Sequence, residues 1–178
     1  SDPGLFSARE VTKKPVLGIS ECGVLTALTL GHRFGVIAIL AQSIPRHMRY
    51  LGAMGVVDRL AAELPVGLQV TELADAARTR QRMVDTGRRL VEEHGAHVIV
   101  MGCAGMAQYR APLEDALGVP VVEPTQAAAG MALVMVPPEP NVRMPLFTLF
   151  CTTAPRSSTT VPAASISTPL AKAEPAPL

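Results

Sequence analysis

The sequence predicts an α/β protein whose strands run parallel in an open sheet. Short, mostly β-branched apolar runs bounded by turn residues alternate along the chain with segments of helical periodicity. Such runs are typical of strands buried on both faces, and the alternation is typical of a parallel sheet with right-handed crossovers. The predicted strands are residues 16–19, 34–40, 68–70, 98–101 and 119–122.

Helical patterns fill the intervals between these strands. The clearest is the segment 75–94, which starts at an aspartate, carries apolar or small residues at helical spacing and is followed by Gly95. An acidic residue at the start and a glycine just past the end are common boundary signals of a helix. The predicted helices are residues 21–30, 46–63, 75–94 and 106–117.

The composition favours a small-molecule partner. The chain has 16 basic and 15 acidic residues, a formal net charge of +1, and only 3% aromatic residues. We therefore expect no basic surface with stacking rings of the kind that binds nucleic acid. No apolar run approaches the roughly 20 uncharged residues that span a bilayer, and no secretory signal pattern opens the chain. We expect a cytoplasmic protein with neither a nucleic-acid nor a membrane partner.

The cysteines predict free thiols. Cys22, Cys103 and Cys151 are odd in number and form no CxxC pair, which disfavours both a disulfide framework and a zinc cage. Cys151 lies in residues 137–178, which are rich in Pro, Ser, Thr and Ala and are expected to form a mostly disordered tail, so we interpret this cysteine as incidental. The sequence also has no pairs of histidines or carboxylates at ligand spacing and no glycine-rich phosphate loop. We expect no metal and no cofactor.

An internal repeat relates the beginning and the end of the predicted folded region. KPVLGISECGVLTALTL (residues 14–30) resembles VPVVEPTQAAAGMALVM (residues 119–135) at an offset of 105 residues. Each copy is a proline-led strand, a hydroxyl residue at the strand end and a helix of small residues. Ser20 matches Thr125, and each is placed to cap the following helix with its hydroxyl group.

The same register extends upstream of the repeat. It matches the helix at 106–117 with residues 5–12 and places the counterpart of Cys103 about two residues before Ser1. The first copy therefore lacks strands that would complete its sheet, and a parallel strand needs neighbours. We expect the sequence to be the C-terminal piece of a longer protein.

Cys103, in the stretch VIVMGCAGMAQ, is the strongest candidate for chemistry. It follows the predicted strand 98–101, and open parallel sheets bind ligands at the carboxyl ends of their strands. The N-terminus of the helix expected next would stabilise a thiolate. Cys103 is thus a candidate base or nucleophile, and the alternative is a small buried core residue.

Few other side chains are placed to assist this thiol. Three histidines lie in turns that lead into strands, at the opposite edge of the sheet: His32, His94 and His97. His47 lies near the mouth of the site, and we interpret it as a solvated residue of the helix at 46–63. Cys22 could line the same cleft, but its repeat partner Ala127 favours a packing role.

Several motifs together resemble the Asp/Glu/hydantoin racemase family: VIVMGCAGMA, VPVVEPTQAA, SDPGLFSARE and KPVLGISE. The resemblance runs from Ser1 to about Val136. It implies two pseudo-symmetric α/β lobes with parallel sheets, no cofactor, and one cysteine from each lobe on opposite sides of the substrate's stereocentre. One thiolate removes the Cα proton and the other thiol returns a proton to the opposite face. Cys103 matches the family's second cysteine, and the first would precede Ser1.

The resemblance also implies a domain organisation and an assembly. We expect the first lobe to be incomplete in this chain, and we expect a homo-oligomer on the family resemblance alone. The expected segments are residues 1–32, a remnant of the first lobe with a crossover helix, 33–118, the second α/β lobe, 119–136, a strand and helix linking back to the first lobe, and 137–178, the tail.

Ala104 points to the substrate class. In hydantoin and allantoin racemases alanine follows the second cysteine, whereas glutamate and aspartate racemases usually have threonine at that position. The resemblance therefore favours a 5-substituted hydantoin or a related amino-acid derivative as substrate. The backbone N–H groups of Gly105 and Met106 are expected to hold the enolate oxygen. The residues expected to orient the ring are Ser20, Glu21, Gln42 and Thr125.

Two other functions stay open. Relatives with a single cysteine resemble this fold and decarboxylate malonates, delivering one proton from one thiol, and a chain with only Cys103 fits that chemistry. An inactive truncated product is the third possibility.

Overall fold

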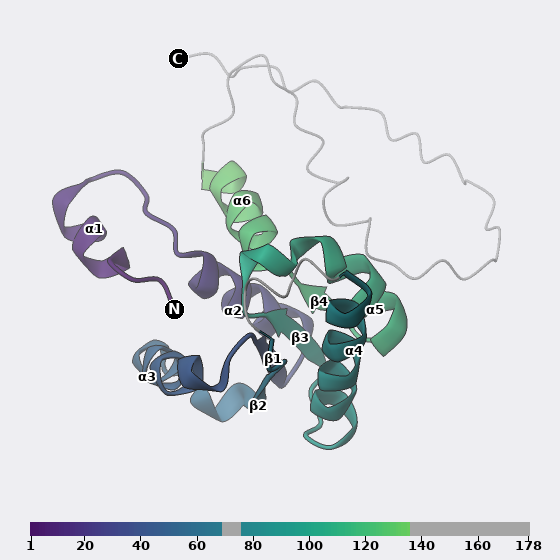
Figure 1. Ribbon diagram of the computed structural model, residues 1–178. Helices are drawn as coiled ribbons and strands as arrows, with labels where there is room; N and C mark the ends of the chain where they lie inside the picture. The colour runs from purple at the N-terminus through teal and green to yellow at the C-terminus, as the bar shows by residue number, and fades with distance from the viewer. Residues whose placement is uncertain (69–75, 136–178) are drawn as a thin grey trace, which may run out of the picture. The chain divides into compact units, whose positions relative to one another are not determined.

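The computed structural model describes residues 1–68 and 76–135, all within one compact unit, Ser1–Pro137. Its core is a four-stranded sheet with the strand order β2-β1-β3-β4, in which every pairing is parallel (Figure 1). The strands are β1 (Phe34–Ala38), β2 (Leu60–Pro65), β3 (Val98–Met101) and β4 (Val121–Val122). The predicted α/β class with a parallel sheet is confirmed, and the expected tail lies outside the described residues.

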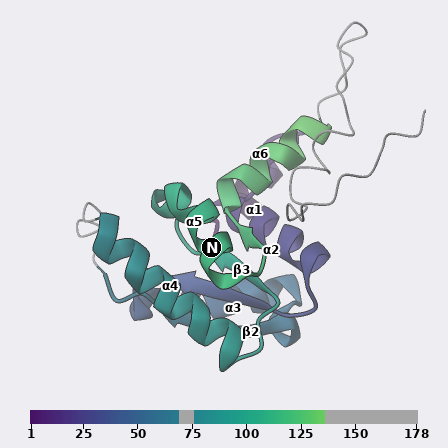
Figure 2. The same cartoon turned by 90° about the vertical axis from the view of Figure 1, so that its right-hand side faces the viewer.

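Helices cover both faces of this sheet. Helices α4 and α5 pack on one face, whereas α2 packs on the other and α6 runs beside α2 (Figure 2). None of the helices in the described ranges is long and apolar enough to cross a membrane. The α-helices are α1 (Leu5–Val11), α2 (Ile19–Leu30), α3 (Ile44–Met54), α4 (Ala76–Glu92), α5 (Arg110–Leu117) and α6 (Pro124–Met135), and the 3₁₀ segments are η1 (Ala41–Ser43), η2 (Val57–Arg59) and η4 (Ala104–Tyr109).

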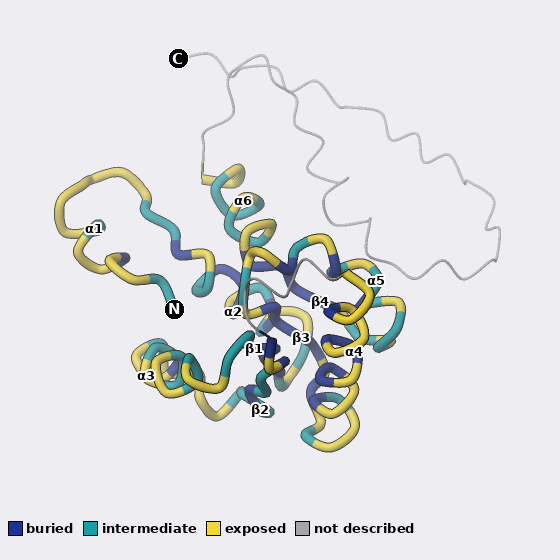
Figure 3. The backbone as a smooth tube through the Cα atoms, in the orientation of Figure 1, coloured by how far each residue is buried: buried dark blue, intermediate teal, exposed yellow. Residues whose placement is uncertain are grey.

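Alternation along the strands builds two apolar cores. Phe34 and Val36 of β1 join the cluster under α2, whereas Ile37 joins the cluster under α4. In β3, Val98 and Ile99 divide between the two clusters in the same way. Successive side chains of a strand point to opposite faces, so strands covered on both sides must be apolar throughout. Figure 3 accordingly shows β1 and β3 buried along their length.

The prediction of one helix over residues 46–63 is wrong beyond Met54. Gly55 adopts the left-handed conformation (φ 71°) and its N–H donates to the carbonyls of the last turn, which ends α3. The chain then forms β2, a strand that the sequence did not predict. β2 reads LAAELP, and alanine, glutamate and proline all have low strand propensity. It forms because it pairs with β1 at the edge of the sheet, where a terminal proline is tolerated.

Two other predicted strands are also corrected. Residues 16–18 belong to no strand and Ile19 begins α2, since no described strand lies beside this segment to pair with it. The carbonyl of Val16 instead accepts a hydrogen bond from Nε of Arg9 (3.0 Å). Of the predicted strand 68–70, only Leu68 is described, and it is a buried core residue outside any strand. The remaining predicted strands and helices are confirmed, with boundary shifts of a few residues.

Strands β1 and β3 stay hydrogen-bonded beyond the last residue of β3. The N–H of Gly102 donates to the carbonyl oxygen of Ile37 at 2.8 Å. A Cβ atom on Gly102 would lie only 2.5 Å from that same oxygen. Because this neighbour is backbone and cannot rotate away, only glycine allows the two chains to come this close here.

We predict that Gly102→Ala lowers the free energy of unfolding by about 1–3 kcal/mol, the usual cost of overpacking, because β3 must move away from β1. Chemical denaturation measures this. Gly130→Ala is the matched control, since a Cβ there meets nothing within 4 Å and the site lies inside α6. Alanine in a helix interior should be neutral or stabilise by up to about 1 kcal/mol. Equal effects of the two substitutions would show that the contact is not restrictive.

Candidate functional site

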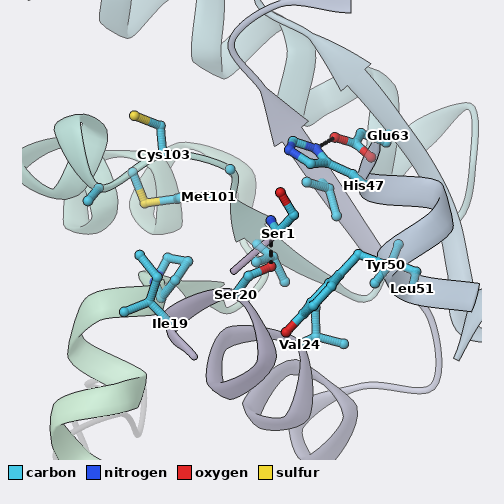
Figure 4. A pocket seen from close by; sticks show the side chains of 15 residues that line it. Ser1, Ile19, Ser20, Val24, His47, Tyr50, Leu51, Glu63, Met101 and Cys103 are labelled. Carbon is cyan, nitrogen blue, oxygen red and sulfur yellow. Dashed lines mark hydrogen bonds and ion pairs between the residues drawn. The ribbon is translucent and has the colours of Figure 1, made fainter. Parts of the chain in front are cut away.

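A cavity of about 100 Å³ lies at the carboxyl end of β3 (Figure 4). Its walls come from the end of β3 and the residues after it, from the first turns of α2 and α6, from α3 and from β2. Most of its lining is apolar. The polar side chains among the lining residues are Ser1, Ser20, His47, Tyr50, Glu63 and Cys103.

Cys103 is the first residue after Gly102 at the end of β3, and it lines the cavity as predicted for a strand end. It is half-buried, its backbone is extended (φ −150°, ψ 133°), and it precedes η4. The sequence predicted the N-terminus of a helix next to this cysteine. In the structure the first α-helical residue that follows is Arg110, so the dipole of an α-helix does not begin at Cys103. Its position in the cavity wall, rather than at the end of an α-helix, makes this thiol a candidate reactive group.

His47 and Glu63 form a pair in the opposite wall of the cavity from Cys103, with Ser1 between them in the view of Figure 4. Nδ1 of His47 lies 2.5 Å from Oε1 of Glu63. The side chains are only 15% and 1% exposed. The interpretation of His47 as a solvated residue is therefore wrong, because α3 ends early enough for β2 to bring a carboxylate against it. The sequence analysis missed Glu63 since it placed this residue in a helix.

Asp2 caps α2, the helix whose first turn lines the cavity. Its Oδ1 accepts the backbone N–H of Ser20 and its Oδ2 that of Glu21, both at 2.9 Å. Tyr50 adds a hydrogen bond from its hydroxyl to Oδ2 (2.7 Å). Partial burial works against ionisation of Asp2, but these three hydrogen bonds outweigh it and lower the pKa of its carboxyl group. Burial, followed by the bond to Asp2, raises the pKa of Tyr50.

In the second copy of the repeat, a carboxylate from a different position caps the helix. The carboxylate of Glu123 accepts the backbone N–H groups of Thr125 (2.9 Å) and Gln126 (2.7 Å) at the start of α6. In the repeat register Glu123 corresponds to Gly18, and a Cβ on Gly18 would overlap the Asp2 carboxylate at 2.1 Å. Asp2 thus occupies the space of the missing side chain. The prediction that the Ser20 and Thr125 hydroxyls cap these helices is wrong, because carboxylates hold the N–H groups.

The structure brings two of the predicted site residues, Ser20 and Cys103, into the lining of the cavity. The hydroxyl of Ser20 accepts a hydrogen bond from the Ser1 nitrogen (3.2 Å). The N–H of Met106 donates to the Cys103 carbonyl (3.1 Å), which engages one of the two donors expected to hold an enolate. The other predicted residues are not among those lining the cavity: Glu21, which pairs with Arg9, the buried Met106, and the exposed Gln42, Gly105 and Thr125.

Cys22 has the packing role that the sequence favoured. It is 1% exposed and does not line the cavity. Burial, followed by the negative charges of Glu21 and Asp2, raises the pKa of the Cys22 thiol. This makes Cys22 a poor source of thiolate, whereas Cys103 reaches the cavity. Cys151 lies outside the described residues.

Comparison with known proteins finds racemases among the relatives of this chain. The family model for Asp/Glu/Hydantoin racemase matches residues 1–132. The chain is 37% identical over 137 residues to a hydantoin racemase from Pseudomonas sp., covering 76% of this chain and 55% of that protein. It is 36% identical over 132 residues to a hydantoin racemase from Rhizobium meliloti, covering 74% and 55%. The chain therefore spans a little more than half the length of the curated relatives it matches.

The fold is also similar to that of solved structures. The crystal structure of an allantoin racemase from Pseudomonas fluorescens superposes with a TM-score of 0.72 at 31% identity, covering 74% of this chain and 57% of that one. The parallel sheet with helices on both faces is thus the arrangement found in a racemase of known structure.

We predict that Asp2→Ala lowers the free energy of unfolding by about 1 kcal/mol at pH 7, as is usual for the loss of a helix cap. The deficit should shrink in acid. The folded pKa of Asp2 lies below the ordinary value of about 3.9, so its contribution is complete above that value and is lost as the pH falls through the folded pKa.

Denaturation at pH 7 and at pH 3 checks this. The matched control is Asp58→Ala in η2, where the side chain is exposed, and it should change stability by less than about 0.5 kcal/mol at both values. A deficit for Asp2→Ala that is the same at both pH values would contradict the assignment of the carboxylate as an ionised cap.

Proposed function

Because the chain belongs to the Asp/Glu/hydantoin racemase family, we propose that it supplies one acid/base group of a cofactor-independent racemase that inverts a carbon stereocentre. The observation that carries the proposal is the position of Cys103 in the wall of a cavity at a strand end. The proposed substrate is a 5-substituted hydantoin or a related amino-acid derivative.

The proposed reaction needs only proton transfers. The thiolate of Cys103 takes the proton from the stereogenic carbon and becomes a thiol, while the electron pair of the broken C–H bond moves onto the adjacent carbonyl as an enolate. A second thiol then donates its proton to the opposite face of that carbon and becomes a thiolate. The overall charge is unchanged and no oxidant or reductant is consumed. The carbonyl next to the reacting carbon makes the proton acidic enough for a thiolate to remove.

We propose that the second thiol stands just before Ser1 in the natural protein. The repeat register places the counterpart of Cys103 about two residues upstream of Ser1. Ser1 itself lines the cavity and donates a hydrogen bond to Ser20 at the start of α2. A side chain directly upstream would therefore begin at the cavity wall, in agreement with a base on each side of the substrate.

The lining of the cavity supports a small, partly polar ring as substrate. Apolar side chains such as Val36 and Leu51 alternate with the polar groups of Ser20, His47 and Glu63. The named relatives are hydantoin and allantoin racemases, and allantoin is itself a hydantoin that carries a ureido group on its stereogenic carbon.

We further propose that the protein is cytoplasmic and associates with further copies of itself. Its near-neutral charge and low aromatic content favour a small-molecule partner over nucleic acid.

Exchange in D₂O tests the function. We predict that the natural protein, with any residues that precede Ser1, exchanges the C5 proton of a 5-substituted L-hydantoin and forms the D-isomer. Each thiol is the base for one isomer, so Cys103→Ala should reduce the exchange rate of either the L- or the D-isomer by roughly 10²- to 10⁴-fold, the usual share of a general base. NMR follows the exchange and chiral chromatography follows the inversion. Cys22→Ala is the matched control, because it removes a buried thiol at a position whose repeat partner is alanine.

The outcomes separate the possible functions. Exchange with inversion supports the two-thiol racemase. Exchange with full retention indicates that a single thiol works from one face, as in the decarboxylases. Absence of exchange, or full exchange of both isomers in Cys103→Ala, would refute the proposal.

A further inference from the structure

Glu63, a residue in the wall of the cavity, has one side-chain oxygen without a partner. Oε1 of Glu63 is bonded to His47, but Oε2 is buried and has no hydrogen-bond partner among the described residues. An unsatisfied buried acceptor destabilises a protein, and more so when it carries charge, so native structures retain few of them. Because Glu63 lines the cavity, a bound ligand that donates to this oxygen would satisfy it.

Two hydroxyl groups in the cavity lining already make hydrogen bonds. The hydroxyl of Tyr50 donates to Asp2, and the hydroxyl of Ser20 accepts from Ser1. Among the described side chains that line the cavity, Glu63 carries the buried oxygen without a hydrogen-bond partner. The neighbouring Val36 and Leu51 are apolar, and a hydrogen bond is stronger where water is excluded.

His47 holds this carboxylate in place. It reaches Glu63 from α3, 16 residues away in sequence, and occupies one carboxylate oxygen while leaving the other free. A side chain fixed in this way loses little conformational freedom when a ligand binds. Figure 4 places the pair across the cavity from Cys103, with the His47 ring on the side nearer the cysteine, so a ring bound in the cavity would lie between the thiol and the pair.

We propose that Glu63 is a specificity residue that accepts a hydrogen bond from a ring N–H of the substrate, with His47 as its positioning residue. The proposal rests on the proposed function. A hydantoin ring carries two N–H groups, at N1 beside the stereogenic carbon and at N3 between the carbonyls. An ionised carboxylate only accepts hydrogen bonds, so it selects a ring whose nitrogen keeps its hydrogen. The site therefore prefers hydantoins that are unsubstituted at one particular nitrogen.

Methylated substrates test this preference. For the natural protein, calorimetry gives the Kd of a 5-substituted hydantoin and of its N1-methyl and N3-methyl derivatives, and D₂O exchange gives their rates. We expect one of the two methylations to weaken binding by roughly 10- to 100-fold, the effect of losing a hydrogen bond to a charged group. Glu63→Met removes the acceptor and should bring the ratio of the two Kd values, methylated over unmethylated ring, close to one. Glu63→Gln keeps the shape and a neutral acceptor, and should give an intermediate ratio.

The controls separate recognition from folding and from steric effects. Glu93→Met makes the same change at an exposed position and should leave the ratio unchanged. The ratio compares two ligands on one variant, so a partly destabilised protein does not alter it. If the methyl group acts only by its bulk, the preference will persist in Glu63→Met, and the proposal is then wrong.

The readouts also distinguish this proposal from the function on which it rests. Binding that depends on the N–H and on Glu63, without C5 exchange, supports the specificity residue and refutes the racemase. Exchange with no difference between the methylated and unmethylated rings supports the racemase and refutes the role of Glu63. A natural protein that neither binds nor exchanges these rings refutes both.

Discussion

The close pairing of β1 and β3 is the constraint on which the site depends. The two strands lie at the centre of the sheet, and their hydrogen bonding continues to Gly102, whose N–H meets the Ile37 carbonyl at 2.8 Å. A side chain at Gly102 has no room, so the backbone there is held by β1 rather than by local preference. Cys103 follows directly, and its place in the cavity wall is therefore set by the most buried part of the molecule.

Carboxylates hold the N-termini of two helices around this point. Asp2 and Glu123 hold the first N–H groups of α2 and α6, the two helices whose N-termini border the cavity. The two helices correspond to each other in the sequence repeat, yet the carboxylates come from unrelated positions, because Asp2 fills the space beside Gly18. What the two copies share is a negative group at a helix N-terminus, where unpaired N–H groups favour it.

In the proposed function the two walls of the cavity have different tasks. The end of β3 carries the thiol, and the opposite wall carries the His47–Glu63 pair, which α3 and β2 supply. Proton transfer requires a reactive group at the stereogenic carbon, whereas recognition requires a fixed acceptor at the ring edge. Glu63 lies within β2, and Cys103 directly follows Gly102, whose backbone is hydrogen-bonded to β1.

The sequence by itself determined the features that follow from local patterns. Continuous β-branched runs identified β1 and β3, and the strand end identified Cys103, because burial on both faces leaves a clear apolar signature. The family could also be recognised from the motifs around this cysteine. Only the tertiary structure decided β2, whose alanines and glutamate become a strand through pairing with β1. The same pairing brings Glu63 to His47, and a distant Asp2 takes the capping role expected of Ser20. These contacts join residues far apart in the chain, and no local pattern encodes which of them will meet.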